Sequence, residues 1–579
     1  MSSSTSSPSS PIALTLTNAC HHLAAHVDEL LTWQIVDWDH RERGAIVSAE
    51  YGCADNKLTS HFVTAAVYLW LATLADGAPP VDLSPLDDGS DLPFHDRLLA
   101  RTVLAADYLL AAQRPSGNID LLSVNYDSSP DTGFTVQQLC TVFELGKDRL
   151  MAHRFGRDLL ARLETFIRRA VTGMLDGGFH TPNHRWVIVS ALVQARAIFP
   201  DLDVTRTVDA YLAEGIDIDD EGCFIERSVG VYDAVNNRSL LFIAEANVCA
   251  DALPAVQRSL DFDLYLLHAD GSAETGLSRR QDYGTREVAL GLAACYLHAN
   301  HLAPDPRFVE AACRLWAQSL QPVTHLLWTV YALLRFGDPI PTGAQLPTRY
   351  SRIFPQNGIW RVRQERLSAS FFKDTTRLLS LVHGQAELTA LKISLTYFGS
   401  YCGRFFGDEL TVDGDHGVLL NRGLRRPRRP GYELPLGRPV APDDWDASFA
   451  ERPLRQLPPL TAELHVDAVD GGFDLRYHLL DGLDGVAAQI AFDFAPGGIW
   501  ETADTRTKPT AGQVIFLKNG YGEMRYGSDA IRIGPGAVSH GMWQMRDAET
   551  APEHVRVLFT FWTPVEHVFE IRAYRGRNE

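Results

Sequence analysis

Asn183 and His184 lie in the first of several short polar motifs with residues suited to acid–base chemistry. They follow Thr181-Pro182, which is typical of a helix start, so an amide and an imidazole are expected at the same helix end. Asn183 by itself is equally consistent with a helix cap. With His184 beside it, both side chains could face a bound anion, because a helix N-terminus carries partial positive charge.

Tyr232 belongs to the second motif, a glycine-flanked turn with Glu226 and Arg227 before it and Arg238 after it. A tyrosine in such a turn most often packs its ring and leaves its hydroxyl in water. Arginines nearby, however, favour the charged form of a phenol. The motif therefore indicates a tyrosine that could give or take a proton near neutral pH.

Two further motifs combine hydrogen-bond donors with aromatic rings, and their simplest interpretation is solvated turns. Together, such groups are also what a sugar-binding cleft uses to recognise hydroxyls and carboxylates. A single histidine, His383, follows an apolar segment of the second half and would ordinarily be structural. The two motifs are Ser278-Arg279-Arg280-Gln281-Asp282-Tyr283, and Gly117-Asn118-Ile119-Asp120 with Asn125, Tyr126, Asp127, Asp131 and Thr132.

The elements that must position these residues change character in the middle of the chain. From about residue 11 to residue 337, apolar residues recur every three or four positions, which predicts roughly a dozen helices arranged as hairpins in an array that closes on itself. From residue 350 to residue 579 the period is two, which predicts an antiparallel β-sandwich. Residues 338–349 are expected to be a linker, and residues 1–10 a disordered tail.

Composition limits the partners. The 579 residues carry a formal charge of −19, which opposes sequence-independent binding to nucleic acid or to an anionic membrane. Apolar stretches are shorter than the roughly 18 residues of a membrane span, and the N-terminus resembles no signal peptide, so a cytoplasmic location is expected. The eight cysteines form no CxxC pair and are expected to be mostly buried free thiols.

Asn183-His184, then Tyr232, then His383 resemble, in this order, the catalytic residues of the heparinase II/III-like and alginate or oligoalginate lyases, which are polysaccharide lyases. Those families join an incomplete (α/α) toroid to an antiparallel β-sandwich, so the resemblance spans nearly the whole chain. It implies β-elimination at a uronic acid, in which the C5 proton is removed and the 4-O-glycosidic bond breaks to leave a 4,5-unsaturated uronate.

The resemblance also implies roles for individual residues. Asn183 and His184 would bind the uronate carboxylate, with help from Arg238. Tyr232 would be the general acid, and in a syn elimination also the base. His383 would reach across from the β domain as base or charge neutraliser.

The expected partner is an anionic oligosaccharide containing uronate, and no cofactor is expected. A homo-oligomer stays open, and so does a structural metal in the β domain. Several relatives bind zinc there, but Gln385 stands where a ligand would be expected, and we interpret Asp413-Gly414-Asp415-His416 as a turn. The substrate-binding residues are expected to be Arg238, Arg279, Arg280, Gln281, Asn125, Tyr126 and Glu226.

A basic loop with Arg422, Arg425, Arg426, Arg428 and Arg429 is either a solvated loop or a rim that gathers anionic sugar.

Two other classes of function stay open. A glycoside hydrolase on the same kind of toroid would use two carboxylates, for which Asp131, Glu226 and Asp282 are candidates. A sugar-binding protein that kept the fold and lost the chemistry would bind without turnover. The sequence identifies neither the uronate, nor the linkage, nor endo or exo action.

Overall fold

The structure is a computed structural model that describes residues 13–74, 92–319, 325–397, 403–422, 431–458, 460–546 and 548–576. The chain divides into two compact units, one of residues 1–267 and 271–346 and one of residues 268–270 and 347–579. The predicted tail, residues 1–10, lies outside the described residues, and so do Cys402 and the arginines at 425, 426, 428 and 429.

The first unit is helical, as the three-to-four periodicity predicts. Its described residues form twelve α-helices: α1 (Leu16–Thr32), α2 (Asn56–Thr73), α3 (Phe94–Ala112), α4 (Ser129–Ala152), α5 (Arg154–Asp176), α6 (Pro182–Ile198), α7 (Thr205–Leu212), α8 (Tyr232–Glu245), α9 (Ala252–Leu266), α10 (Gly291–Leu302), α11 (Pro306–Gln318) and α12 (Leu326–Phe336). None of these helices is long and apolar enough to span a membrane.

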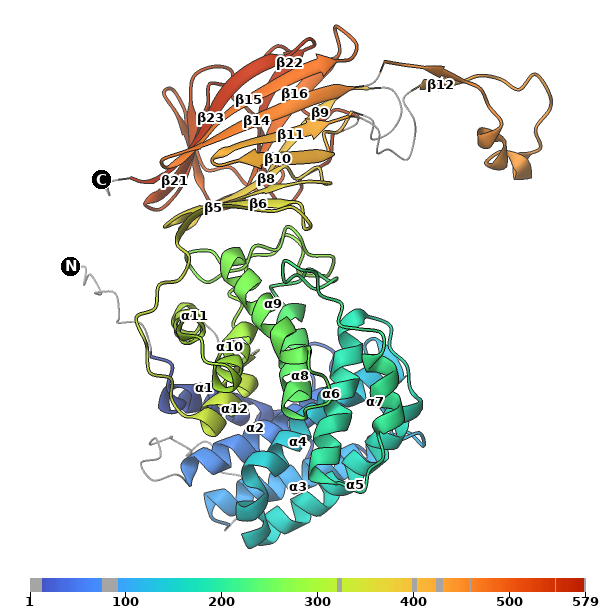
Figure 1. The fold of residues 1–579 in the computed structure, drawn as a ribbon, viewed down its shortest axis with the longest axis vertical. Coiled ribbons are helices and arrows are strands. Elements are labelled where there is room, and N and C mark those ends of the chain that lie inside the picture. Colours follow the sequence, from blue (N-terminus) through green and yellow to red (C-terminus); the bar gives the residue numbers. More distant parts are fainter. Residues whose placement is uncertain are drawn as a thin grey trace. The chain divides into compact units, whose positions relative to one another are not determined.

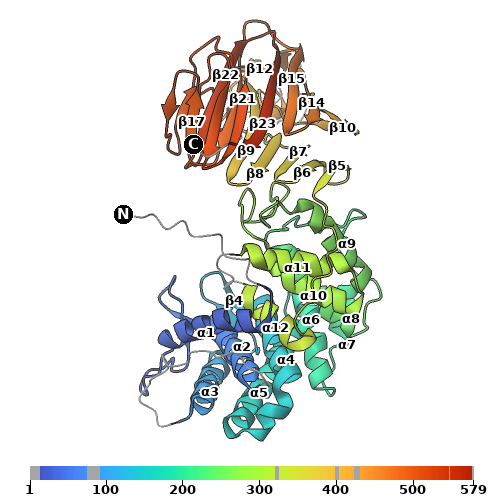
Figure 2. The same cartoon turned by 90° about the vertical axis from the view of Figure 1, so that its left-hand side faces the viewer.

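The helices form two layers (Figures 1 and 2). The even-numbered helices α2, α4, α6, α8, α10 and α12 pack side by side in this order, and α12 packs against α1 and α2. Helices α2 and α6 are buried on nearly all sides, whereas α5 and α11 of the outer layer bury one face. This arrangement confirms the predicted (α/α) toroid.

A buried polar bridge holds three inner helices together. Gln137 of α4 donates through Nε2 to Ser239 Oγ of α8 at 3.0 Å and to Ser190 Oγ of α6. All three side chains are fully buried, so losing one partner would leave a buried polar group unsatisfied. The bridge thereby fixes α4, α6 and α8 relative to one another, and these are the helices that carry the candidate site.

Short antiparallel hairpins connect some of the helices. They are β1 (Ile46–Val47) with β2 (Ala54–Asp55), and β3 (Ile119–Leu121) with β4 (Asn125–Ser128).

The second unit consists of strands in two large sheets, with a third small sheet of β12 (Gly431–Glu433) and β13 (Leu454–Gln456). One large sheet has the order β10 (Glu409–Asp413), β11 (His416–Asn421), β14 (Thr461–Val469), β15 (Gly472–Asp481), β23 (Glu566–Arg575), β21 (Asp529–Gly534), β20 (Gly522–Tyr526), β17 (Ile499–Thr502), β18 (Arg506–Thr507). The other has the order β19 (Val514–Phe516), β22 (Val555–Trp562), β16 (Ala487–Phe494), β9 (Ala386–Leu395), β8 (Leu379–His383), β7 (Leu367–Phe372), β6 (Ile359–Gln364), β5 (Arg349–Phe354).

The predicted sandwich is confirmed, with one difference from a purely antiparallel arrangement. Strand β19 pairs with β22 in parallel, because the chain between them crosses to the other sheet to form β20 and β21 before it returns. Trp360, Phe371, Phe492 and Phe569 belong to one continuous buried core of this unit.

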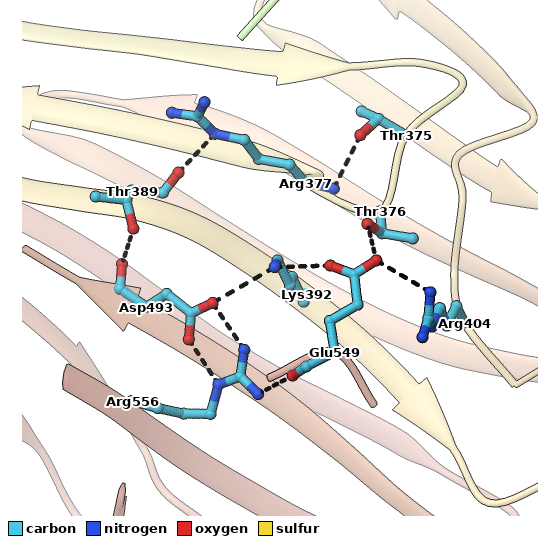
Figure 3. A network of polar contacts seen from close by, with 9 residues as sticks. All are labelled: Thr375, Thr376, Arg377, Thr389, Lys392, Arg404, Asp493, Glu549 and Arg556. Carbon is cyan, nitrogen blue, oxygen red and sulfur yellow. Dashed lines mark hydrogen bonds and ion pairs between the residues drawn. The ribbon is translucent and has the colours of Figure 1, made fainter. Parts of the chain in front are cut away.

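A network of buried and half-buried charges ties a loop of the second unit to its sheet (Figure 3). Asp493 of β16 accepts two hydrogen bonds from Arg556 of β22, at 2.6 and 2.8 Å. Lys392 of β9 lies 3.7 Å from Asp493 and 2.7 Å from Glu549, which also accepts from Thr376 at 2.7 Å. Because these charges are paired, their burial is tolerated and the loop at residue 549 is held in place.

Candidate active site

The predicted catalytic residues of the helical unit lie at the N-terminal ends of neighbouring helices. Asn183 and His184 are in the first turn of α6, where Thr181 has extended backbone and Pro182 opens the helix. Tyr232 is the first residue of α8, and its backbone N–H donates to Ser228 Oγ at 3.2 Å. Helix N-termini favour anionic groups, so these two ends suit a negatively charged ligand.

A chain of polar contacts joins three segments that are far apart in the sequence. Asn183 Nδ2 donates to Glu226 Oε1 at 2.9 Å. Arg280 Nε lies 3.5 Å from the same carboxylate oxygen. The Arg280 guanidinium also stands over the ring of Tyr232, 4.3 Å from its centroid. Arg280 therefore links the tyrosine to the Asn183–Glu226 pair, bringing together four predicted site residues.

Asn183 is fully buried, and its amide nitrogen is engaged on two sides. Nδ2 donates to Thr181 Oγ1 at 3.2 Å as well as to Glu226. Its two N–H groups are thus directed at protein acceptors, which makes Asn183 a positioning group for the Glu226 carboxylate in this arrangement.

Glu226 is almost fully buried, at 3% exposure. Burial raises the pKa of Glu226, and the hydrogen bond from Asn183 and the charge of Arg280 offset part of that rise. Its carboxyl is thus easier to protonate than an exposed one.

His184 lies between the Arg280 cluster and a second group of charges. Burial, followed by the neighbouring His180, lowers the pKa of His184 to about 4. Its ring centroid is 4.5 Å from that of His180 and 6.1 Å from that of Phe134. The imidazole is therefore neutral near pH 7, with one nitrogen able to donate and the other able to accept.

The second group of charges surrounds Asp131, at the start of α4. Lys57 Nζ lies 3.2 Å from Asp131 Oδ1, and Asn125 Nδ2 donates to Oδ2 at 2.9 Å. Burial would raise the pKa of Asp131, but the charge of Lys57 and the hydrogen bond from Ser128 bring it below its ordinary value. Lys57 Nζ stands over the Phe134 ring, 4.5 Å from its centroid, and that ring packs edge-on against His184, so the charges around Asp131 lie close to His184.

Two fully buried carboxyl groups lie beside this site. Burial, and then the charges of Asp282 and Glu226, raise the pKa of Asp233, the second residue of α8. Burial and the neighbouring Asp233 raise the pKa of Asp263 well above its usual range. Asp282 is stabilised differently, because the hydroxyls of Ser228, at 2.9 Å, and Ser278 donate to it.

The remaining predicted binding residues lie at the rim or away from the cluster. Arg279 and Gln281 have exposed side chains, and the Arg279 backbone N–H donates to the Glu226 carbonyl at 3.0 Å. Tyr126 is 66% exposed on β4. The structure does not place Arg238 with the cluster: its guanidinium is buried against the Trp328 ring, 4.3 Å from the centroid.

His383 belongs to the second unit, where it ends β8. Its Nδ1 lies 3.6 Å from Asp529 Oδ1, and Arg366 donates to that carboxylate at 3.0 Å. The next residue, Gly384, has φ +59°, and a Cβ there would collide with Asp529 and Arg366. Glycine is therefore required in the turn that holds His383 beside Asp529. A shared site with Tyr232 stays a prediction.

Three residues that contact the site were not predicted from the sequence: Lys57, His180 and Phe134. Lys57 lies two positions after Asp55, whose carboxylate caps α2 by accepting from the Leu58 N–H at 2.8 Å. That capping motif was a usable signal that Lys57 stands at a helix start, as Asn183 does.

Within the described ranges, no three His, Cys, Asp or Glu side chains are grouped so as to hold a metal ion. Residues 414 and 415 form the turn between β10 and β11, and His416 Nδ1 lies 2.7 Å from Asp467. The seven described cysteines are free, and Cys20, Cys140, Cys223 and Cys295 are buried.

Comparison with known proteins bears on the fold. No protein-family model and no curated protein matches the chain. Heparinase III is similar in structure, with a TM-score of 0.55 at 10% identity, over 100% of this chain and 88% of that protein. The chondroitin AC lyase of Streptomyces coelicolor A3, solved in complex with chondroitin sulphate, gives 0.53 at 12% identity, over 99% and 81%.

A xanthan lyase of Paenibacillus gives a TM-score of 0.53 at 11% identity over 97% of this chain, which spans only 57% of the length of that lyase. At such identities the likeness establishes the shared fold, a helical toroid with a β-sandwich.

Proposed function

We propose that this protein is a lyase that cleaves the 4-O-glycosidic bond of a uronic acid by β-elimination, acting on an anionic oligosaccharide. The observation that carries the proposal is the position of Arg280, which stands over the Tyr232 ring and beside the Asn183–Glu226 pair. Two of the structural relatives are named as lyases, a xanthan lyase and a chondroitin AC lyase, which supports the same class.

The chemistry requires the negative charge of the substrate to be balanced. The C5 proton of a uronate is poorly acidic until the adjacent carboxylate is stabilised, and the developing enediolate needs preorganised donors. Arg280 supplies a permanent positive charge, and neutral His184 supplies one N–H donor. A bound carboxylate would itself raise the pKa of His184, which strengthens that hydrogen bond.

Asn183 and Glu226 support this charge balance in different ways. In the proposal, Asn183 helps bind the substrate carboxylate by exchanging its hydrogen bond to Glu226. Because burial raises the pKa of Glu226, this residue can take up a proton and so remove a second negative charge from the site.

Tyr232 is proposed to transfer the protons. Removal of the C5 proton leaves its electron pair to form the C4–C5 double bond, while the C4–O4 bond breaks and its electron pair stays on O4. In an anti elimination another base takes the C5 proton and the phenol of Tyr232 donates its proton to O4. In a syn elimination Tyr232 reacts as the phenolate: its oxygen accepts the C5 proton, and the phenol so formed donates that proton to O4. His383 is proposed to act from the second unit as base or charge neutraliser.

The test is to incubate the protein with a panel of uronate-containing oligosaccharides and follow both the ultraviolet absorbance and the mass of the products. A lyase gives an unsaturated product without adding water, whereas a hydrolase adds water and gives no absorbance. Binding without either product would instead identify a sugar-binding protein.

Asn183→Ala and His184→Ala separate stabilisation of the transition state from ground-state binding. Both variants are expected to lower kcat more than they raise KM, because the charge they stabilise develops during the reaction. An effect on KM alone in both variants would restrict these residues to substrate binding.

A further inference from the structure

Asp282 carries a buried carboxylate in a turn that is otherwise exposed. It is 5% exposed, whereas its neighbours Gln281 and Tyr283 are exposed. In the part of the chain that the structure describes, the carboxylate is bonded by hydroxyl groups and paired with no cation. Burying a carboxylate without a cation is costly unless hydrogen bonds compensate. The partners of Asp282 therefore indicate what this residue does.

The hydroxyl of Ser228 connects Asp282 to the turn that carries Tyr232. Ser228 Oγ donates to Asp282 Oδ1 at 2.9 Å and accepts from the backbone N–H of Tyr232 at 3.2 Å. The carbonyl of Ser228 also accepts from the Asp233 N–H at 2.9 Å. Because Tyr232 is the first residue of α8, Ser228 fixes the point from which the phenol projects.

The hydroxyl of Ser278 makes the equivalent connection to Arg280. Ser278 Oγ donates to the same atom, Asp282 Oδ1, and accepts from the backbone N–H of Arg280 at 3.0 Å. A serine hydroxyl has one proton to donate and two lone pairs, whereas a carboxylate can only accept. Each hydroxyl therefore gives its proton to Asp282 and keeps its lone pairs for a backbone N–H group. One carboxylate oxygen thus sets the direction of both links.

The two links form a closed ring of contacts with the side chains of the candidate site. The Arg280 guanidinium stands over the ring of Tyr232, 4.3 Å from its centroid. Ser228 and Ser278 are buried, at 0% and 6% exposure, so the loss of either hydroxyl would leave buried polar groups unsatisfied. The buried carboxylate of Asp282 completes this ring on the side away from the guanidinium and the phenol.

The backbone of the Tyr232 turn is held in a conformation that the chain does not favour by itself. Arg227 has φ +54°, which is uncommon for a residue other than glycine. Gly230 packs directly on the carboxylate, because a Cβ there would lie 2.8 Å from Asp282 Oδ2. Such backbone conformations persist where the surrounding contacts over-determine them. The contacts of Asp282 are among those that hold this turn.

We propose that Asp282 is a positioning residue that sets Tyr232 and Arg280 relative to each other through the two serine hydroxyls. The inference rests on the proposed function, in which the phenol transfers protons and the guanidinium balances the charge of the substrate. The precision of this arrangement matters, because a misplacement of about 1 Å can lower a rate roughly 10²-fold. Asp282 is thereby assigned a role other than that of a hydrolase carboxylate, which would have to face the substrate.

The first experiment measures the arrangement without any substrate. Fluorotyrosine replaces Tyr232 alone in the full chain, and its fluorine NMR resonance reports on the cation over the ring. Arg280→Met supplies the resonance position of the ring without that cation. Ser228→Ala and Ser278→Ala, which both keep the charge of Asp282, should each move the resonance towards this position by more than the line width. An unmoved resonance in both serine variants would overturn the inference.

Ser259→Ala is the matched control for the serine variants. Ser259 is fully buried in the same unit, and its hydroxyl accepts from Asn237 Nδ2 at 3.0 Å, so its loss also leaves a buried polar group unsatisfied. This control should leave the resonance unmoved, and a shift as large as in the serine variants would overturn the inference.

A change of shape keeps the inference testable if a serine variant does not fold. Gly230→Ala retains every hydrogen-bonding group and should move the resonance, because the added Cβ displaces the carboxylate of Asp282. Gly178→Ala is its control, since a Cβ there meets nothing within 4 Å. Equal resonance positions in these two variants would overturn the inference.

The second experiment measures turnover on an oligosaccharide that the wild type cleaves. Asp282→Ala should lower kcat roughly tenfold or more and raise KM by a smaller factor, because it disturbs groups that act in the transition state. Asp282→Asn should keep more of the kcat, since its amide oxygen can still accept from a serine hydroxyl. Adding Ser228→Ala to Asp282→Ala should have little further effect, because both act through one carboxylate. Equal losses in the Ala and Asn variants, or effects that multiply, would overturn the inference.

The two experiments separate this inference from the lyase proposal. A moved resonance in the serine variants, with no unsaturated product from any substrate, would overturn the lyase proposal alone. An unmoved resonance in a chain that is an active lyase would overturn the positioning role of Asp282 alone.

Discussion

The link between Arg280 and Glu226 allows a quantitative test of the site geometry. The side chain of Glu226 is only 2% exposed, and the Arg280 side chain beside it is 20% exposed. Arg280→Met removes the cation and leaves the Glu226 carboxylate buried without its partner charge. Binding a proton would neutralise this carboxylate and so limit the free-energy cost of burying an unpaired charge. Protonating a carboxyl of ordinary pKa 4.5 at pH 7 costs about 3.4 kcal/mol, and burial has already raised the pKa of Glu226.

The expected loss of unfolding free energy in Arg280→Met is therefore about 1–3 kcal/mol, because the cost of protonating the carboxyl at pH 7 sets its upper limit. Glu226→Gln in the same chain removes the stranded charge, so the double variant should recover at least about 1 kcal/mol. Arg280→Lys is the matched control, because it keeps the charge and loses the planar group over the Tyr232 ring.

The assay is urea unfolding of the helical unit, followed by circular dichroism, with turnover measured on the same samples. Stability should recover in the double variant, whereas turnover should not, because the cation is needed in the reaction. A coupling free energy below about 0.3 kcal/mol would show that the two side chains act independently and would refute the geometric argument.

Three further predictions concern buried charges. Because the pKa of His184 is lowered to about 4, its contribution to stability is present above about pH 6.5 and is lost as the pH falls towards 4; His184→Asn should remove up to about 3 kcal/mol of this acid-induced loss in urea unfolding. The pKa of Asp263 is raised, so its contribution to stability is present at low pH and is lost as the pH rises. Asp263→Asn should therefore raise the melting temperature, relative to the wild type, by more at pH 9 than at pH 5. Equal differences at the two pH values would contradict the assignment. Asp493→Asn should lower the free energy of unfolding by about 3–5 kcal/mol, because it leaves the buried Arg556 without its partner charge. Adding Arg556→Met should restore more than half of this loss. A loss below about 1 kcal/mol in Asp493→Asn would show that stability does not depend on the network of Figure 3.

The elements of the fold were largely predictable, because their signals are local. The periodicity of three and four predicts the helices, and the period of two predicts the sandwich. The parallel pairing of β19 with β22 has no local signal, since it depends on where the chain returns after two strands in the other sheet.

The candidate site was predictable where its residues stand at recognisable chain features. Thr181-Pro182 marks the start of α6 and thus the position of Asn183. The pairing of Lys57 with Asp131 links residues 74 positions apart, and a single sequence carries no trace of it. The buried Asp263 was missed for a different reason, because an aspartate within a helical pattern is ordinarily expected at the surface.

The most direct test of the central claim is the turnover of Tyr232→Phe, measured as the absorbance of the unsaturated product from an oligosaccharide that the wild type cleaves. The substitution deletes one hydroxyl at the start of α8 and leaves the ring under Arg280, so folding and substrate binding should be unchanged. General acid and base contributions predict a fall in kcat of roughly 10² to 10⁴. A variant that keeps more than about a tenth of the wild-type kcat would contradict the role of Tyr232 in proton transfer.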